Sequence, residues 1–485
     1  MITAIPFRST RGSIVGTPTK SKKELADPMR NALILSIVLT APSFALGAEA
    51  RKPNVLVILS DDVGWGEYGF QDGKDIPTPN IDSIAKNGVR CTQGYVSGPY
   101  CSPTRAGFLT GRYQTRFGHE FNSVGNQSGL SLKETTIADR LRAQGYATCA
   151  IGKWHLGAKP DFRPTKRGFD EFFGTLNNTP YYHPTQFVDS RISDDVRAID
   201  DDSFYTTEAY TDRAIDWLDK QKEKPWFLYV PFNAQHAPLA APQKYMDRFP
   251  HIADRTRRTF AAVMSALDDG VGRILAKVRE RGEEENTLIV FFSDNGGPTR
   301  STTSSNGPLR GFKATTWEGG IRVPFCMQWK GVFPAGKTYE HPIIQLDLLP
   351  TALAATGAAI APAWKLDGVD LRPYLTGVRT EAPHKTLYWR FGDQWAIRHG
   401  DWKLLVANEG SGKPELYDLA NDIGESTDLA AKQPDRVKEL QALWDTWNAE
   451  QAPPIVPKET PGAATKAAQK KAAKKAAQKA LPPPV

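Results

Sequence analysis

A cysteine, a proline and an arginine lie close together in residues 101–105, Cys-Ser-Pro-Thr-Arg. Gly-Pro at 98–99 indicates a turn, and a proline favours the first turn of a helix, where its missing N–H needs no partner. We therefore expect a helix that begins at or just before Cys101, with N–H groups and a dipole that favour an anion. Arg105 lies one turn further along the same face. This pattern predicts a nucleophile beside an anion pocket, although a small buried cysteine on an ordinary helix is the alternative.

Two apolar runs, each typical of a parallel strand buried on both faces, end in a pair of oxygen-bearing side chains. These are residues 54–60, followed by Asp61 and Asp62, and residues 287–293, followed by Asp294 and Asn295. The carboxyl ends of parallel strands are where open α/β sheets bind ligands. Three carboxylates and one amide oxygen suit Ca²⁺ or Mg²⁺ and do not suit zinc. Either pair alone could equally be a turn aspartate or a helix cap.

Four basic side chains complete the set of candidate functional residues. Lys153 and His155 are two residues apart in an extended segment, so they point to the same face. His236 comes just after another predicted strand, and Lys313 follows residues 299–312. The Ser, Thr, Asn and Gly of that segment predict a mobile loop at the active site.

The pattern of the chain changes near residue 371. Before it, helical and strand-like stretches alternate; after it, short aromatic strands are separated by Gly and Asp turns and followed by an amphipathic helix. We expect a catalytic domain over 51–370 and an α+β subdomain over 371–451. Residues 452–485, rich in Pro, Lys and Ala, are expected to be a disordered tail.

The formal net charge of +7 comes from the two ends of the chain. Residues 1–50 carry six Lys and Arg against three Asp and Glu, and residues 458–485 carry seven Lys against one Glu, which leaves −2 for residues 51–457. The high charge is therefore no sign of nucleic-acid binding, and we expect no nucleic-acid partner.

Residues 1–50 are expected to be a signal or targeting segment. An apolar run at 32–39 follows Met29 and Arg30, and Ala-Glu-Ala at 48–50 resembles a cleavage site. Translation could begin at Met29. The run is too short for a stable membrane helix, so we expect export to the periplasm, cell surface or medium without membrane insertion. An uncleaved anchor is the alternative.

The chain has four cysteines and no zinc-type spacing. They are Cys91, Cys101, Cys149 and Cys326. If Cys101 is catalytic, at most one disulfide can form among the others, and their apolar surroundings favour buried free thiols.

Residues 101–112 read Cys-x-Pro-x-Arg-(x)4-Thr-Gly-Arg, which resembles the signature of the formylglycine-dependent type I sulfatases, cysteine subtype. Further motifs follow in the family's order, among them Gly-Lys-Trp-His-Leu-Gly at 152–157, His-Ala-Pro at 236–238 and the segment 311–324. The resemblance covers roughly residues 52–450. It implies an alkaline-phosphatase-like α/β fold, with a large mixed, mostly parallel sheet flanked by helices, and a smaller C-terminal α+β domain with an antiparallel sheet and a helix.

The resemblance also implies a sulfuric ester hydrolase of the arylsulfatase-like kind. In that family the cysteine, here Cys101, is oxidised by a formylglycine-generating maturation enzyme to formylglycine (3-oxoalanine), whose hydrate supplies the attacking oxygen. One Ca²⁺ is bound per active site. Its implied ligands are Asp61, Asp62, the modified Cys101, Asp294 and Asn295.

The remaining family roles fall on five residues. Arg105 and Lys153 would stabilise the formylglycine hydrate and the sulfate oxygens. His155 would be the base that regenerates the aldehyde. His236 and Lys313 would contact the sulfate, and one of them would protonate the leaving alcohol.

A sulfated carbohydrate is the expected substrate, although another sulfated small molecule would fit the same chemistry. This expectation depends on export and on aromatic and polar residues in the loops, Tyr181, Tyr182, His183, Arg390 and Trp395, which are equally compatible with ordinary packing. Two alternatives remain: a phosphodiester or phosphonate ester hydrolase of the same superfamily, and a non-catalytic glycan-binding relative.

Overall fold

The computed structural model describes residues 51–122 and 129–455. The predicted signal segment and nearly all of the predicted tail therefore lie outside the described residues. Among the helices of the described ranges, none has the length and apolar character that a membrane crossing needs.

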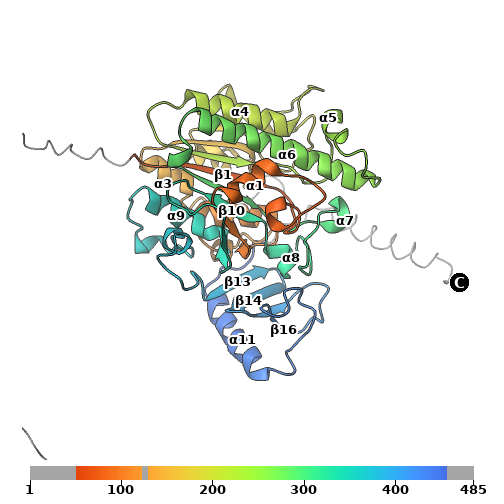
Figure 1. Cartoon of the computed structure of the whole chain (residues 1–485). Coiled ribbons are helices and arrows are strands. Elements are labelled where there is room, and N and C mark those ends of the chain that lie inside the picture. The colour runs from red at the N-terminus through yellow and green to blue at the C-terminus, as the bar shows by residue number, and fades with distance from the viewer. Residues whose placement is uncertain (1–50, 123–128, 456–485) are drawn as a thin grey trace, which may run out of the picture. The chain divides into compact units, whose positions relative to one another are not determined.

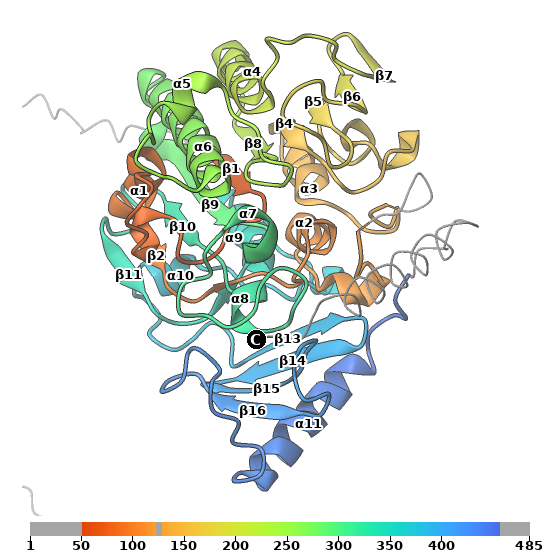
Figure 2. The same cartoon turned by 90° about the vertical axis from the view of Figure 1, so that its right-hand side faces the viewer.

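A ten-stranded mixed sheet forms the centre of the molecule (Figures 1 and 2), in the order β11-β2-β10-β9-β1-β8-β4-β5-β6-β7. The five central strands from β9 to β5 are all parallel to one another, and antiparallel pairs occur only toward the two edges. The strands are β1 (Asn54–Ser60), β2 (Val89–Cys91), β4 (Ala147–Lys153), β5 (Glu171–Thr175), β6 (Phe187–Asp189), β7 (Ser193–Arg197), β8 (Trp226–Pro231), β9 (Thr287–Ser293), β10 (Phe325–Gln328) and β11 (Lys337–Tyr339).

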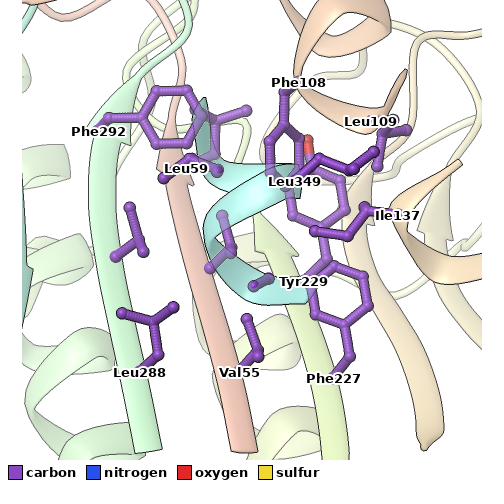
Figure 3. Close-up of a cluster of buried hydrophobic side chains, with 14 of the residues drawn as sticks. Val55, Leu59, Phe108, Leu109, Ile137, Phe227, Tyr229, Leu288, Phe292 and Leu349 are labelled. Atoms are coloured by element: carbon purple, nitrogen blue, oxygen red, sulfur yellow. The ribbon is translucent and has the colours of Figure 1, made fainter. Parts of the chain in front are cut away.

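Helices cover both faces of this sheet, which explains why every residue of β1 is buried. Val55, Val57 and Leu59 face one hydrophobic cluster, whereas Leu56 and Ile58 face another on the opposite side. Figure 3 shows the first cluster, in which side chains of α2, α3 and α9 pack on the central strands. The helices are α1 (Pro79–Lys86), α2 (Cys101–Thr110), α3 (Ile137–Ala143), α4 (Thr206–Lys220), α5 (Gln243–Met246), α6 (Arg255–Glu280), α7 (Thr299–Thr302), α8 (Glu318–Ile321), α9 (Leu348–Ala355), α10 (Arg372–Leu375) and α11 (Pro434–Asn448).

A second, four-stranded antiparallel sheet forms below the first with α11 against it (Figure 1). Its strands are β13 (Thr386–Phe391), β14 (Gln394–His399), β15 (Trp402–Val406) and β16 (Glu415–Asp418). A short parallel pair, β3 (Gly94–Tyr95) and β12 (Ile343–Ile344), lies apart from both sheets. The predicted fold class is confirmed; the division at residue 370 stays a prediction.

The segment 299–312, predicted to be a mobile loop, is anchored at several points. Its first residues form α7, and the Ser304 hydroxyl accepts a hydrogen bond from Gly64 N–H (2.9 Å). The side-chain amide of Asn306 donates to the carbonyls of Gly297 and Gly311 (both 3.1 Å). A Cβ at Gly64 would lie 2.1 Å from the Ser305 carbonyl oxygen, so only glycine allows this close packing.

Candidate active site

Helix α2 begins at Cys101, as the sequence predicts, and its N-cap is Tyr100 in an extended conformation. The Cys101 side chain is completely buried. Burial, and then the carboxylates of Asp294 and Asp61, raise the pKa of its thiol well above the usual range. The unmodified side chain is therefore a protonated thiol, which is a poor nucleophile.

The register of β1 and β9 brings the two acidic pairs together. Ser60 and Ser293, the last residues of these parallel strands, are directly paired, so both strands end at the same edge. Ligand atoms of Asp61, Asp62, Cys101 and Asp294 lie within 4.8 Å of one another. The predicted meeting of these side chains is found in the structure.

Two buried cations lie against the carboxylates. The Arg105 guanidinium is 2.8 Å from Asp294 Oδ2 and 3.3 Å from Asp61 Oδ2. Lys153 Nζ forms a salt bridge with the same Asp61 oxygen, and all four side chains are fully buried. Burial would raise the pKa of Asp61, but Lys153 and then His236 and Arg105 bring it well below the usual range. Asp61 is therefore an anion at neutral pH.

Lys313 supplies the third cation and reaches the nucleophile position itself. Its Nζ lies 2.6 Å from Asp62 Oδ1 and 3.4 Å from Cys101 Sγ. Burial alone would lower the pKa of Lys313, but Asp62 and then Cys101 raise it well above the usual range. Three carboxylates and three cations thus balance one another around Cys101.

Asn295 provides a test of whether a metal ion fits here. Its side-chain amide donates to Asp62 Oδ1 (2.8 Å), whereas its Oδ1 is buried and accepts no hydrogen bond from the described residues. A buried oxygen without a donor is costly unless something else satisfies it. Together with three carboxylates, this oxygen makes a donor set that fits a hard cation such as Ca²⁺.

The two predicted histidines lie on segments that follow β4 and β8. His155, with φ of +59°, is buried, and its Nδ1 has no hydrogen-bond partner among the described residues. Burial, then Lys153 and Arg105, lower its pKa well below the usual range. His236 Nδ1 donates to the Ala237 carbonyl (2.6 Å), which leaves Nε2, 3.7 Å from Asp62, without a proton. Burial, then Lys153, also lower the pKa of His236.

The structure adds two residues that the sequence motifs did not reveal. The Ser102 hydroxyl donates to the His155 carbonyl (2.7 Å), and its oxygen lies 2.7 Å from His119 Nε2. This bridge ties the segment after β4 to the first turn of α2. Ser102 lies inside the Cys-x-Pro-x-Arg segment, whereas no sequence signal marked His119.

Three residues proposed from sequence as carbohydrate contacts have other partners in the structure. Tyr181 is buried, and Arg390 donates to the buried carboxylate of Glu120 (2.6 Å). The Trp395 ring packs on Trp444 of α11, with 4.6 Å between ring centroids. The expectation of free cysteines holds, because all four are unpaired and buried.

Comparison with known proteins identifies the family. The family model described as Sulfatase matches residues 53–358. Arylsulfatase J of Mus musculus is 32% identical over 474 residues, which span 85% of this chain and 79% of the relative. The chain belongs to the sulfatase family. This sulfatase is accordingly a sulfuric ester hydrolase, and its site, with a buried cysteine among balanced charges, lies within the matched region.

Two further similarities concern a sulfatase whose name gives a sugar and a protein solved in complex with a carbohydrate. The N-acetylgalactosamine-6-sulfatase of Canis lupus familiaris is 32% identical over 396 residues, covering 76% of this sulfatase and 74% of the relative. The crystal structure of Ps i-CgsB in complex with k-i-k-neocarrahexaose is 34% identical, with a TM-score of 0.77, and covers 84% of this chain and 96% of that chain.

Proposed function

We propose that this sulfatase hydrolyses sulfate esters of carbohydrates, using a formylglycine formed from Cys101 and one bound Ca²⁺. The observation that carries the proposal is the convergence of three cations and three carboxylates on a buried cysteine at the start of α2. The carbohydrate in the Ps i-CgsB structure and the name of the N-acetylgalactosamine-6-sulfatase support the substrate class.

The charges of the site explain why a divalent cation would be needed. Within the protein the three carboxylates neutralise the three basic side chains, so little positive charge is left for an anionic substrate. A sulfate monoester carries one negative charge, which a poorly solvated site must compensate. A bound Ca²⁺ would make the pocket net positive and would polarise a sulfate oxygen.

Five residues would hold this ion. They are Asp61, Asp62, Asp294, Asn295 and the modified Cys101. The strongest support for a cation site is Asn295 Oδ1, which is buried and accepts no hydrogen bond from the described residues.

A thiol at position 101 does not fit the reaction. Its pKa is raised by burial and nearby carboxylates, and a cysteine side chain has no second leaving proton with which to expel sulfate. The hydrated aldehyde of formylglycine supplies one hydroxyl that attacks sulfur and a second hydroxyl whose deprotonation releases the sulfate. Overall, the ester and water give an alcohol, sulfate and a proton.

His155 is suited to remove that proton. Its lowered pKa keeps the imidazole neutral at pH 7, and its buried Nδ1 has no partner among the described residues. Arg105 and Lys153, which hold Asp61, would stabilise the oxygens of the hydrate and the sulfate.

His236 and Lys313 are the two candidates for protonating the leaving alcohol. Lys313 carries a proton at neutral pH, because its pKa is raised, and its Nζ is 3.4 Å from Cys101 Sγ. His236 presents an unprotonated Nε2 in this state. We therefore assign the proton for the leaving alcohol to Lys313. His236 would contact a sulfate oxygen once its Nε2 has gained a proton, because only an N–H can donate to that oxygen.

The proposal also covers the export of the protein, its maturation and its division into domains. Residues 1–50 would direct export to the periplasm, cell surface or medium, and a formylglycine-generating enzyme would be an obligatory partner. The catalytic domain (51–370), the α+β subdomain (371–451) and the tail (452–485) remain the proposed division.

The test combines mass spectrometry with sulfate release. We expect the peptide containing residue 101, from protein made in the native host, to show the mass decrease of a thiol converted to an aldehyde. The same protein should release sulfate from N-acetylgalactosamine 6-sulfate or sulfated carrageenan oligosaccharides. Cys101→Ala should lose activity by on the order of 10⁴-fold or more, whereas the buried control Cys326→Ala should keep it.

Two results would contradict the proposal. Full hydrolytic activity with an unmodified Cys101 would exclude the formylglycine chemistry. Phosphodiester hydrolysis faster than sulfate release, or carbohydrate binding without turnover, would favour the alternative functions.

A further inference from the structure

Three partly exposed aromatic side chains form a cluster that the catalytic roles leave unused. Tyr100, Phe121 and Phe391 come from three separate parts of the chain, and each of these residues is partly exposed. The ring centroids of Tyr100 and Phe391 are 5.6 Å apart, and those of Phe121 and Phe391 are 5.1 Å apart. We call these three side chains the aromatic wall.

The aromatic wall adjoins the reacting position. Tyr100 immediately precedes Cys101 and is the N-cap of α2. Lys313 Nζ is 4.9 Å from the centroid of the Tyr100 ring and 3.4 Å from Cys101 Sγ. The lysine therefore links the charged pocket to the wall, and a group attached to a bound sulfate on this side would meet the rings.

A dedicated set of hydrogen bonds holds Phe391 in place. Phe391 ends β13 at a two-residue turn, where Gly392 has φ of +61° and donates its N–H to Glu120 (3.1 Å). Glu120 is fully buried and also binds Arg390. The C-terminal sheet therefore holds the Phe391 ring at a fixed position beside Tyr100.

A second contact fixes the same hairpin to the segment that carries Lys313. Gln394, paired with Phe391 across the turn, donates from Nε2 to the carbonyl of Ala314 (2.9 Å). Ala314 directly follows Lys313, and its N–H donates to the Pro99 carbonyl (2.8 Å). The ring of Phe391 and the amine of Lys313 therefore share one rigid framework.

Building on the proposed function, we propose that the aromatic wall is the surface on which the sugar ring next to the reacting sulfate stacks. A pyranose presents C–H groups on its faces, and these pack on the electron-rich faces of aromatic rings. Rigid aromatic rings lose little conformational entropy when they bind. The C-terminal hairpin β13–β14 is accordingly a determinant of which carbohydrate is accepted.

The test compares Phe391→Leu with the unchanged protein on two kinds of substrate. Phe391 is chosen because it touches the other rings without taking part in the charged pocket. For a sulfated neocarrahexaose or N-acetylgalactosamine 6-sulfate, we expect kcat/KM to fall about tenfold, mainly through KM, because an apolar contact is lost. For methyl sulfate, whose alkyl group is too small to reach the rings, the change should stay within about twofold.

Affinity gives an independent measurement that needs no maturation. In the Cys101→Ala background, the Kd for the same oligosaccharide, measured by calorimetry, should rise about tenfold with Phe391→Leu. Phe391→Tyr should restore both kcat/KM and Kd. Trp402→Leu, a partly exposed aromatic in β15 at the other end of the sheet, is the matched control and should change neither.

The outcomes separate this inference from the proposed function. Equal losses on the sugar and methyl substrates, or no loss on either, would overturn the stacking role while leaving carbohydrate hydrolysis intact. Turnover of 4-nitrophenyl sulfate, with no sulfated carbohydrate bound or hydrolysed by the unchanged protein, would overturn the substrate class and the stacking role together.

Discussion

Asn295 shows how a single buried oxygen can support a proposed metal site. Its Nδ2 is satisfied by Asp62, but its Oδ1 is buried without a donor within the described residues, next to a cluster of carboxylates. The local fold therefore orients this oxygen for something other than protein. Calcium binding should stabilise the native state, since the ligands converge only after β1 and β9 pair.

Calcium should raise the melting temperature of this sulfatase, and Asn295→Ala should reduce that rise. The stabilisation amounts to about 2.7 kcal/mol when free Ca²⁺ exceeds its Kd about a hundredfold. Differential scanning calorimetry in Ca²⁺ and in a chelator measures it. Asn421→Ala, at an exposed asparagine, serves as control, and an equal calcium response in both variants would remove Asn295 from the ligand set.

His384 makes a prediction about pH and stability. Burial would lower its pKa, but Asp347, 2.7 Å from Nε2, raises it above the usual range. A raised pKa in the folded state gives stability that is complete below the unfolded pKa of about 6.5 and is lost as the pH rises through the folded value. The loss of stability caused by His384→Gln should therefore be larger at about pH 5.5 than at about pH 9.

Thermal denaturation at the two pH values measures this difference, and His399→Gln is the contrast. Burial and then Lys385 lower the pKa of His399, so its stability contribution is lost as the pH falls and the trend should reverse. The same trend in both variants would show that the pH effect comes from elsewhere.

At the scale of elements, a buried ionic network joins the C-terminal sheet to helix α8, which follows Lys313 in the sequence. Lys403 of β15 lies 2.9 Å from Glu318 of α8 and 2.7 Å from Glu425, and all three side chains are fully buried. Glu318 also accepts a hydrogen bond from the Tyr95 hydroxyl (2.5 Å). Burial, partly offset by Lys403, raises the pKa of Glu425 to about 7.

Removing the charge of Lys403 should lower the free energy of unfolding. Lys403→Met leaves two buried carboxylates facing each other, and we expect a loss of about 3–5 kcal/mol of unfolding free energy. Urea denaturation measures this loss, and Lys413→Met, at an exposed lysine, should lie near zero. If the two variants were equally stable, the network would not hold the sheet to α8.

The sequence predicts elements and their ends better than the contacts between distant elements. The apolar runs that became β1 and β9 have a clear pattern, and parallel pairing places their polar ends together, so the acidic pairs could be predicted to meet. The aromatic wall could not, because Phe391 of β13 meets Tyr100, the N-cap of α2, only once the C-terminal sheet packs against the rest of the molecule. Arg390 illustrates the same limit, since only the fold reveals Glu120 as its partner.

For the whole molecule, one hydrophobic cluster joins the C-terminal sheet to segments outside the ten-stranded sheet. Tyr95, Trp317 and Leu346 pack with side chains of β13–β16 and α11, and the Trp389 indole donates to the Val96 carbonyl (2.7 Å). Without residues 371–455, the apolar side chains of Tyr95, Trp317 and Leu346 would therefore be exposed to solvent.

A chain ending at residue 370 should consequently fail to fold into an active enzyme. Its exposed apolar side chains favour aggregation, and the residues around Lys313 lose their contacts with the second sheet. Solubility, near-ultraviolet circular dichroism and hydrolysis of 4-nitrophenyl sulfate measure the outcome. A chain ending at residue 455 is the control. Cooperative unfolding and full activity of the shorter chain would show that the first 370 residues are self-sufficient.

The complete burial of Cys101 has a consequence for the order of events during biosynthesis. The proposed maturation enzyme could not reach a side chain enclosed by Asp61, Asp294 and Lys313, so the proposed oxidation would have to precede closure of the pocket. Cys101 leaves the ribosome well before Asp294 and Lys313, which allows an interval in which its segment is still an open peptide. Conditions that speed folding relative to oxidation would then yield a well-folded but permanently inactive protein.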